Sequence, residues 1–189
     1  MKTRPLMLDL FSGTGGASAA FAEAGWNVIR IDNSPLAVEV VNRDILTYQY
    51  TGAQRPTLIW ASPPCTEFSR ESMPWCRTGK APSMELALAT RRILDTERPC
   101  WWVVENVRGA VKYFEPIFGE PRKYGPFYLW GNFPDLNVQV KPQKERINGN
   151  TVRSRARRAA VPYALSKALL DAITGASYTP TYRPMGGGV

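Results

Sequence analysis

Near its N-terminus the chain reads Leu6-Met7-Leu8-Asp9-Leu10-Phe11-Ser12-Gly13-Thr14-Gly15-Gly16. The apolar run 6–11 is typical of a buried β-strand, and the alanine-rich segment 17–24 after the glycines is typical of a helix. Glycines let the backbone pass close to a ligand, and the free N–H groups at the start of a helix can donate to a polar or anionic group. Residues 12–16 therefore predict a small-molecule site.

A second apolar run, Trp26 to Asp32, follows Gly25 and ends in a carboxylate. An acidic residue at the end of the second strand is placed to bind both hydroxyls of a ribose. Because the glycine spacing does not follow G-x-G-x-x-G, a nucleoside cofactor without a pyrophosphate is as compatible with the turn as a dinucleotide.

The rest of the chain continues to alternate strands with helices. Helices are expected at 36–41, 84–97 and 163–173, strands at 57–61 and 101–104, and a long loop from Cys65 to Pro82. This alternation predicts a parallel, doubly wound α/β sheet, whose ligands bind beyond the carboxyl ends of the strands. Four features are expected at that edge: the glycine turn, Asp32, Cys65 and Glu105.

Cys65 follows two consecutive prolines, Pro63 and Pro64, at the end of the strand 57–61. Each proline fixes one φ angle and removes one N–H donor, so the turn is stiff and cannot continue the sheet. Such a turn can hold a nucleophilic thiol in place. The alternative is an ordinary half-buried cysteine in a loop.

The composition limits the kind of protein. A chain of 189 residues fits one domain, and with three cysteines and no histidine it offers neither histidine catalysis nor a typical zinc site. The odd cysteine count, without a signal peptide, favours a reducing compartment, and we expect a cytoplasmic protein. No apolar run is long enough to cross a bilayer. The formal net charge of +8 favours an anionic partner such as nucleic acid.

Three segments resemble the signature motifs of the cytosine-C5 DNA methyltransferases: residues 9–16, Pro63-Pro64-Cys65 and Glu105-Asn106-Val107. Their order and spacing agree with that family, and the chain is similar to a reduced-size member such as phages, mobile elements or restriction-modification systems encode. The resemblance implies a Rossmann-like fold that uses S-adenosylmethionine. It covers most of residues 6–174, including a C-terminal segment, 160–173, that returns to the cofactor pocket.

The resemblance also implies roles for individual residues. Cys65 corresponds to the nucleophile and Glu105 to the residue that holds the flipped cytosine. The implied cofactor-binding residues come from the glycine turn, the end of the second strand and two later segments: Phe11, Ser12, Gly13, Gly15, Gly16, Asp32, Asn33, Asp44, Ile45 and Pro63.

This sequence also departs from the family pattern. Thr66 stands where the family usually has glutamine, Asn33 stands where a tryptophan often stacks on adenine, and the third strand is abbreviated. Tyr124 and Pro126 stand where arginines are expected. The candidates for the catalytic arginine are therefore Arg122, which we take first, with Arg153 and Arg155.

The expected chemistry follows from cytosine itself, because C5 is a poor nucleophile until something adds to C6. A thiolate of Cys65 that adds to C6 would let C5 take a methyl group from a sulfonium donor. A protonated Glu105 can neutralise the charge that develops at N3, and an arginine can bind O2. The base must leave the duplex for this chemistry, at a cost of a few kcal/mol.

The C-terminal third offers little room for target recognition. We expect a single catalytic domain over 1–174, a minimal target-recognition segment at about 132–160, rich in lysine and arginine, and a flexible tail over 175–189. DNA is the expected substrate, with a target of a few base pairs, or recognition shared with a second subunit or a homodimer. Two alternatives remain: a methyltransferase acting on transfer RNA, and a catalytically silent relative that binds nucleic acid.

Overall fold

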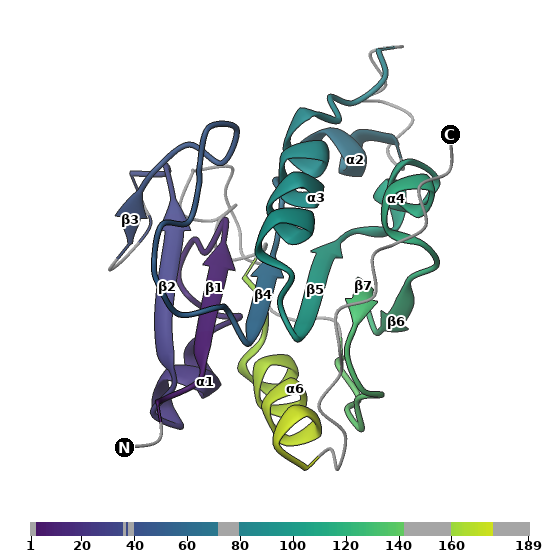
Figure 1. Ribbon diagram of the computed structural model, residues 1–189. Helices are drawn as coiled ribbons and strands as arrows, with labels where there is room; N and C mark the ends of the chain where they lie inside the picture. The colour runs from purple at the N-terminus through teal and green to yellow at the C-terminus, as the bar shows by residue number, and fades with distance from the viewer. Residues whose placement is uncertain (1–2, 36, 38–39, 72–79, 142–159, 176–189) are drawn as a thin grey trace.

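The computed structural model describes residues 3–35, 37, 40–71, 80–141 and 160–175. Its centre is a seven-stranded sheet in the order β3-β2-β1-β4-β5-β7-β6 (Figure 1). The strands are β1 (Leu6–Leu10), β2 (Asn27–Asp32), β3 (Val41–Asn42), β4 (Leu58–Ala61), β5 (Trp101–Asn106), β6 (Arg122–Tyr124) and β7 (Phe127–Asn132). The strands β1 to β5 run parallel to one another, whereas β7 is antiparallel to both of its neighbours, β5 and β6. The predicted doubly wound, mostly parallel sheet is confirmed.

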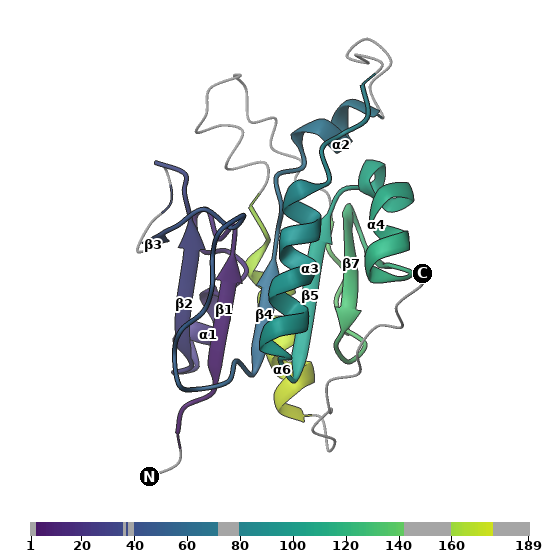
Figure 2. The same ribbon diagram turned by 45° about the horizontal axis from the view of Figure 1, so that its top comes forward.

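Helices cover both faces of the sheet. They are α1 (Ala19–Glu23), α2 (Thr66–Glu71), α3 (Glu85–Glu97), the short 3-10 helix η2 (Arg108–Ala110), α4 (Val111–Phe118) and α6 (Tyr163–Gly175). Figure 2 shows α3 on one side of the sheet and α6 on the other. The central strands β4 and β5 are buried along their whole length because both of their faces are covered.

Alternate residues of each strand enter two separate cores, as the two-residue period of a strand requires. Leu8, Ile59 and Val104 pack with α3 and α4 in one core. Met7, Trp60 and Val103 pack with α1 and α6 in the other. Because β1, β2, β4 and β5 run parallel, their carboxyl ends lie at one edge of the sheet, where the sequence predicts the site.

Several predicted boundaries need correction. Val41 belongs to β3 and residues 37 and 40 are not helical, so the helix predicted over 36–41 is wrong there, while residues 36, 38 and 39 lie outside the described part. The predicted loop after Cys65 begins with α2, because Phe68 packs into the core against Phe114, and residues 72–79 lie outside the described part.

The C-terminal region differs as well. Gly175 is the last residue of α6 and not the start of a tail, and residues 176–189 lie outside the described part. Of the predicted target-recognition segment, residues 142–159 lie outside it too, so that prediction and the division into domains stay predictions. The antiparallel pair β6–β7 is a feature that the strand and helix patterns do not predict.

Candidate active site

The glycine turn begins with a non-glycine residue in the left-handed region, since Phe11 has φ +59°. Its N–H and that of Ser12 both donate to the Ile31 carbonyl, at 2.9 and 3.3 Å, so the chain reverses direction against the end of β2. Gly13 and Gly15 also have positive φ, +51° and +78°. Glycine adopts positive φ without steric penalty, so the strain lies at Phe11, and strained residues of this kind are often found at ligand sites because surrounding contacts must hold them there.

Asp32 joins the end of β2 to the glycine turn. Its carboxylate accepts a hydrogen bond from the Gly13 N–H at 2.8 Å and another from the Ser34 N–H at 2.6 Å. A carboxylate has about four acceptor positions, so Asp32 keeps acceptor capacity for a ligand while it shapes the turn. The predicted ribose-binding residue therefore lies beside the predicted turn.

A cavity of about 130 Å³ lies against the glycine turn. Its lining comes from β1, the turn, the start of α1, the residue before Pro63, and the segment before α6: Asp9, Phe11, Ser12, Gly13, Thr14, Gly16, Ala17, Ser62, Ala160 and Val161. A Cβ on Gly16 would lie 2.3 Å from the Val161 carbonyl oxygen, so only glycine allows these two segments to meet. The C-terminal segment thus returns to the cavity, as the resemblance implied.

For two buried polar side chains in this cavity, the described part of the chain provides no hydrogen bond of normal geometry. They are the carboxylate of Asp9, which is 1% exposed, and the hydroxyl of Ser12, which is 8% exposed. Burial raises the pKa of Asp9 to about 7, although the nearby Ser18 hydroxyl and the Arg30 charge act in the opposite direction. Buried polar groups without partners are uncommon, and here they offer a polar ligand both a carboxylate and a hydroxyl.

Asn106 holds the cysteine turn against the end of β5. Its side-chain amide donates to the buried Pro63 carbonyl at 2.9 Å, and its amide oxygen accepts from the Val107 N–H at 2.9 Å. The Cys65 carbonyl accepts from the Ser69 N–H at 2.8 Å, which starts α2 directly after the cysteine. The stiff turn predicted from the two prolines is therefore fixed at both ends.

Glu105 is almost fully buried beside this turn, with 8% of its surface exposed. Burial raises its pKa to about 7, and a hydrogen bond from the Ser62 side chain offsets part of that rise. Burial also raises the pKa of the Cys65 thiol, the Ser69 side chain lowers it, and the charge of Glu105 raises it again. The charge of Glu105 therefore acts on Cys65, and the catalytic roles of both residues stay predictions.

Ser62 links the two halves of the site. It lines the cavity at the glycine turn, and its hydroxyl is hydrogen-bonded to Glu105 and accepts from the Trp60 indole N–H at 2.8 Å. Ser62 therefore lies between the predicted cofactor cavity and the carboxyl group of Glu105 and contacts both.

The remaining predicted residues lie nearby or elsewhere. Pro63 lines a second cavity of about 260 Å³, between α2, α3 and α4, and not the cavity at the glycine turn. Ile45 is buried in the core that contains α3, while Asn33 and Asp44 are exposed near the ends of β2 and β3. Their roles stay predictions.

Arg122 is engaged away from these groups. Its guanidinium donates to Asp135 at 2.9 Å and to the Phe133 carbonyl at 2.8 Å, and lies 3.5 Å from the centre of the Phe133 ring. It lines neither cavity. The structure gives Arg122 a structural contact, and Arg153 and Arg155 lie outside the described residues.

Sequence reasoning assigned no role to Asp9, Ser62 or Asn106. Asp9 carried one available signal, a charged residue inside an otherwise apolar strand. Asn106 followed Glu105 in the motif, where a second polar residue at a buried strand end indicates a partner across the chain. Ser62 belongs to the Ser-Pro-Pro-Cys turn, which also resembles the family members that methylate transfer RNA, but the sequence indicated no contact between Ser62 and Glu105.

Comparison with known proteins gives the family. Residues 6–115 match the family model described as C-5 cytosine-specific DNA methylase, which is more than half of the chain. The chain belongs to this family. The resemblance drawn from the three motifs is therefore confirmed, and the family implies the use of S-adenosylmethionine.

Two curated relatives are similar over part of their length. The chain is 41% identical over 68 residues to a probable DNA (cytosine-5)-methyltransferase of Frog virus 3, covering 34% of this chain and 30% of that protein. It is 31% identical over 119 residues to the type II methyltransferase M.HindV of Haemophilus influenzae, covering 56% and 38%. The matches therefore span well under half of either relative.

Among solved structures, the Entamoeba histolytica methyltransferase EhMeth has a similar fold. It superposes with a TM-score of 0.50 at 15% identity, covering 80% of this chain and 62% of that one. In the described part of the chain, no helix is long and apolar enough to span a membrane, and no group of three or more acidic or cysteine side chains could hold a metal ion.

Proposed function

We propose that this methylase-family chain transfers a methyl group from S-adenosylmethionine to C5 of cytosine in DNA, through a covalent adduct of Cys65 with a base turned out of the duplex. The observation that carries the proposal is the hydrogen bond from Asn106, the residue after Glu105, to Pro63, which joins the end of β5 to the turn that carries Cys65, while Ser62 of the same turn lines the cavity at the glycine turn.

The cavity suits the methionine part of S-adenosylmethionine. That part carries one ammonium and one carboxylate group, and the cavity offers the Asp9 carboxylate, the Ser12 hydroxyl and the strained turn. Asp32, with acceptor capacity left, would take the ribose hydroxyls. When bound, S-adenosylmethionine supplies an electrophilic methyl group on a sulfonium.

Cys65 would form the bond that activates the base. The Cys65 thiolate would add to C6, and C5 would then take the methyl group as the donor sulfur keeps the electron pair of the broken S–CH3 bond and becomes a neutral thioether. Loss of the C5 proton to water would re-form the C5–C6 double bond as the C6–S bond breaks and returns the Cys65 thiolate. Because burial and Glu105 raise the pKa of Cys65, the thiol is mostly protonated at neutral pH. The substrate complex would therefore have to favour the thiolate, for example by excluding a charged Glu105.

Glu105 fits the role of a hydrogen-bond donor to N3. With a pKa of about 7, it is substantially protonated at neutral pH, as a donor must be. Arg122 is bound to Asp135 and Phe133, so the proposal assigns the O2 contact to no described arginine.

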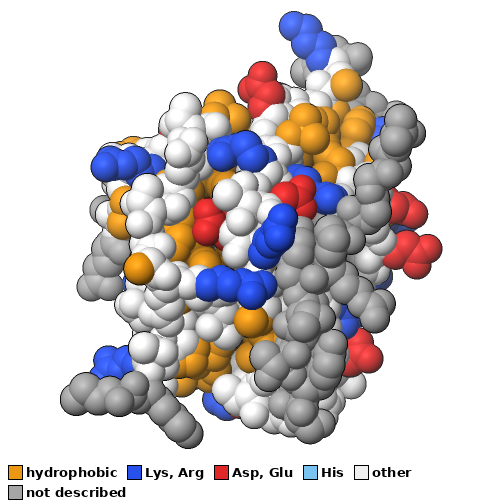
Figure 3. All heavy atoms as spheres, in the orientation of Figure 1, with side chains coloured by type: hydrophobic (Ala, Val, Ile, Leu, Met, Phe, Trp, Pro, Cys, Tyr) orange, Lys and Arg blue, Asp and Glu red, His pale blue; other side chains and the backbone are white. Residues whose placement is uncertain are grey.

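DNA fits the net charge of +8. On the face seen in Figure 3, lysine and arginine side chains are spread among acidic ones and do not form one basic strip. Phosphate contacts spread in this way would give affinity with little sequence information.

A DNA oligonucleotide that contains 5-fluorocytosine, incubated with the protein and S-adenosylmethionine, tests the proposal by trapping the covalent adduct. Fluorine at C5 cannot leave as the proton does, so the adduct should persist and shift the protein band on a denaturing gel. We expect the band with wild type and with Cys100→Ala, a matched control for the other free cysteine of the described residues, but not with Cys65→Ala. An RNA oligonucleotide of the same sequence should give no band. The absence of an adduct with wild type, or its presence with Cys65→Ala, would overturn the proposal.

A further inference from the structure

The side chain of Arg30, in β2, extends to the glycine turn and lies beside Gly15. Its Nε donates to the Ser18 hydroxyl at 2.9 Å, and that hydroxyl donates to the Gly15 carbonyl at 3.3 Å. The guanidinium itself lies against the turn, because a Cβ on Gly15 would be 2.8 Å from both Cζ and Nε of Arg30. Gly15 has φ +78°, a conformation that glycine adopts without steric penalty, and the guanidinium occupies the space that a side chain at this position would need.

Arg30 also lies opposite the buried acid of the cavity. It is in register with Asp9 on β1, so the two side chains project from the same face of the sheet. Its positive charge opposes the effect of burial on Asp9, whereas Asp32 adds to that effect. Asp9 lines the cavity, and no described residue gives either of its carboxylate oxygens a hydrogen bond of normal geometry.

We propose that Arg30 is a positioning residue for S-adenosylmethionine binding, whose guanidinium holds the glycine turn in the shape that borders the cavity and, from its place in register with Asp9, favours the carboxylate form of that side chain. The proposal rests on the proposed function, because it needs S-adenosylmethionine in this cavity. A charged Asp9 attracts the ammonium group of the methionine part, and the planar guanidinium supports the turn from below.

This arrangement makes cofactor affinity depend on pH. The groups that face Asp9 are Arg30 and Asp32 from β2, Ser18 from the start of α1, and Trp60 in register on β4. Ala160 and Val161, which close the cavity, carry no titratable side chain. As pH rises toward 7, Asp9 loses its proton and affinity should rise. Without the Arg30 charge the pKa of Asp9 moves further up, so the rise in affinity between these pH values should be smaller.

Titration calorimetry with S-adenosylmethionine tests this, from about pH 5.5 to about pH 7.5, where the ammonium group of the ligand stays mostly charged. For wild type we expect affinity to rise several-fold over this range. Arg30→Met should bind about tenfold more weakly at the upper end and show a clearly smaller rise. Arg30→Lys keeps the charge but not the planar group, so it should keep the wild-type rise at a lower affinity.

Arg55→Met is the matched control. It removes the same charge from an exposed arginine that donates to the Arg98 carbonyl, at the opposite edge of the sheet. Its affinity and pH dependence should equal those of wild type.

Arg30→Met with wild-type affinity and pH dependence would overturn the role of Arg30. If Arg30→Met does not fold by circular dichroism, Arg30→Lys decides, and a wild-type affinity in that variant would overturn the role as well. Wild-type protein that binds no S-adenosylmethionine at any pH would instead overturn the proposed function, and the role of Arg30 with it.

Discussion

Replacing Ser166 by alanine tests how the C-terminal helix closes the cofactor cavity. Ser166 is fully buried in α6; its hydroxyl donates to the Ala17 carbonyl at 2.7 Å and accepts from the Ala20 N–H at 3.3 Å. Ser18 gives the start of α1 no side-chain cap, because its hydroxyl bonds to Gly15 and Arg30. Ser166 therefore caps α1 from a helix that lies far along the sequence.

The cost of Ser166→Ala follows from these two contacts. A hydrogen bond contributes about 1 kcal/mol net, and a buried group left without a partner costs about 1 to 3 kcal/mol, so we expect the free energy of unfolding to fall by about 2 to 3 kcal/mol. Urea denaturation followed by circular dichroism measures it. Cofactor affinity should fall too, because α6 carries the segment with Val161 over the cavity.

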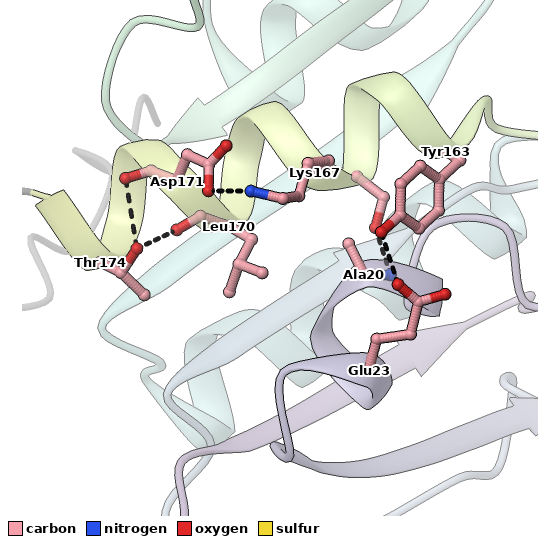
Figure 4. A network of polar contacts seen from close by, with 8 residues as sticks. Ala20, Glu23, Tyr163, Lys167, Leu170, Asp171 and Thr174 are labelled. Atoms are coloured by element: carbon pink, nitrogen blue, oxygen red, sulfur yellow. Dashed lines mark hydrogen bonds and ion pairs between the residues drawn. The ribbon is translucent and has the colours of Figure 1, made fainter.

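Thr174→Ala is the control on the same helix. Its hydroxyl bonds to the Leu170 and Asp171 carbonyls at the exposed end of α6, near the Lys167–Asp171 ion pair and away from the Tyr163–Glu23 contact with α1 (Figure 4). Removing an exposed hydroxyl should change the free energy of unfolding by less than about 0.5 kcal/mol. If Ser166→Ala costs no more than this control, the capping argument is refuted.

Three further results are expected. Gly16→Ala should lower the free energy of unfolding by about 1 to 3 kcal/mol in urea, since its Cβ would lie 2.3 Å from the Val161 oxygen, and a neutral effect would contradict that contact. In the folded protein the pKa values of Asp9 and Glu105 are raised to about 7, from 3.8 and 4.5. The stability that these two groups contribute is therefore fully present below about pH 4 and is lost as the pH rises through 7. The urea midpoint should decline over this range, and it should decline less steeply in Asp9→Asn. Single-turnover methylation should fall as Glu105 loses its proton above about pH 7, and a Glu105→Gln variant with the same decline would show that another group titrates.

The sequence predicts the site best where a motif stands at the end of a buried, apolar strand. β1, β4 and β5 are buried along their whole length, so their apolar runs stand out in the sequence, and the parallel topology puts their carboxyl ends at one edge of the sheet. The sequence therefore predicts that the glycine turn, Cys65 and Glu105 lie at the same edge, because each lies at or just beyond the carboxyl end of one of these strands.

Features that depend on distant partners could not be predicted. The pair β6–β7 forms because Phe127–Asn132 adds to the free edge of β5 in antiparallel register, and no helix periodicity or turn pattern indicates that pairing. Ser166 meets Ala17 across nearly the whole chain. The motif pattern leaves the catalytic arginine unplaced, with Arg122 as the first candidate, and nothing in the sequence indicates that the Arg122 guanidinium binds Asp135 and Phe133.

The most direct test of the account is mass spectrometry of nucleosides from DNA incubated with the purified protein and S-adenosylmethionine bearing an isotopically labelled methyl group. The account predicts labelled 5-methylcytosine with wild type and Cys100→Ala, and none with Cys65→Ala. DNA without labelled 5-methylcytosine after wild-type treatment, or 5-methylcytosine made by Cys65→Ala, would contradict it.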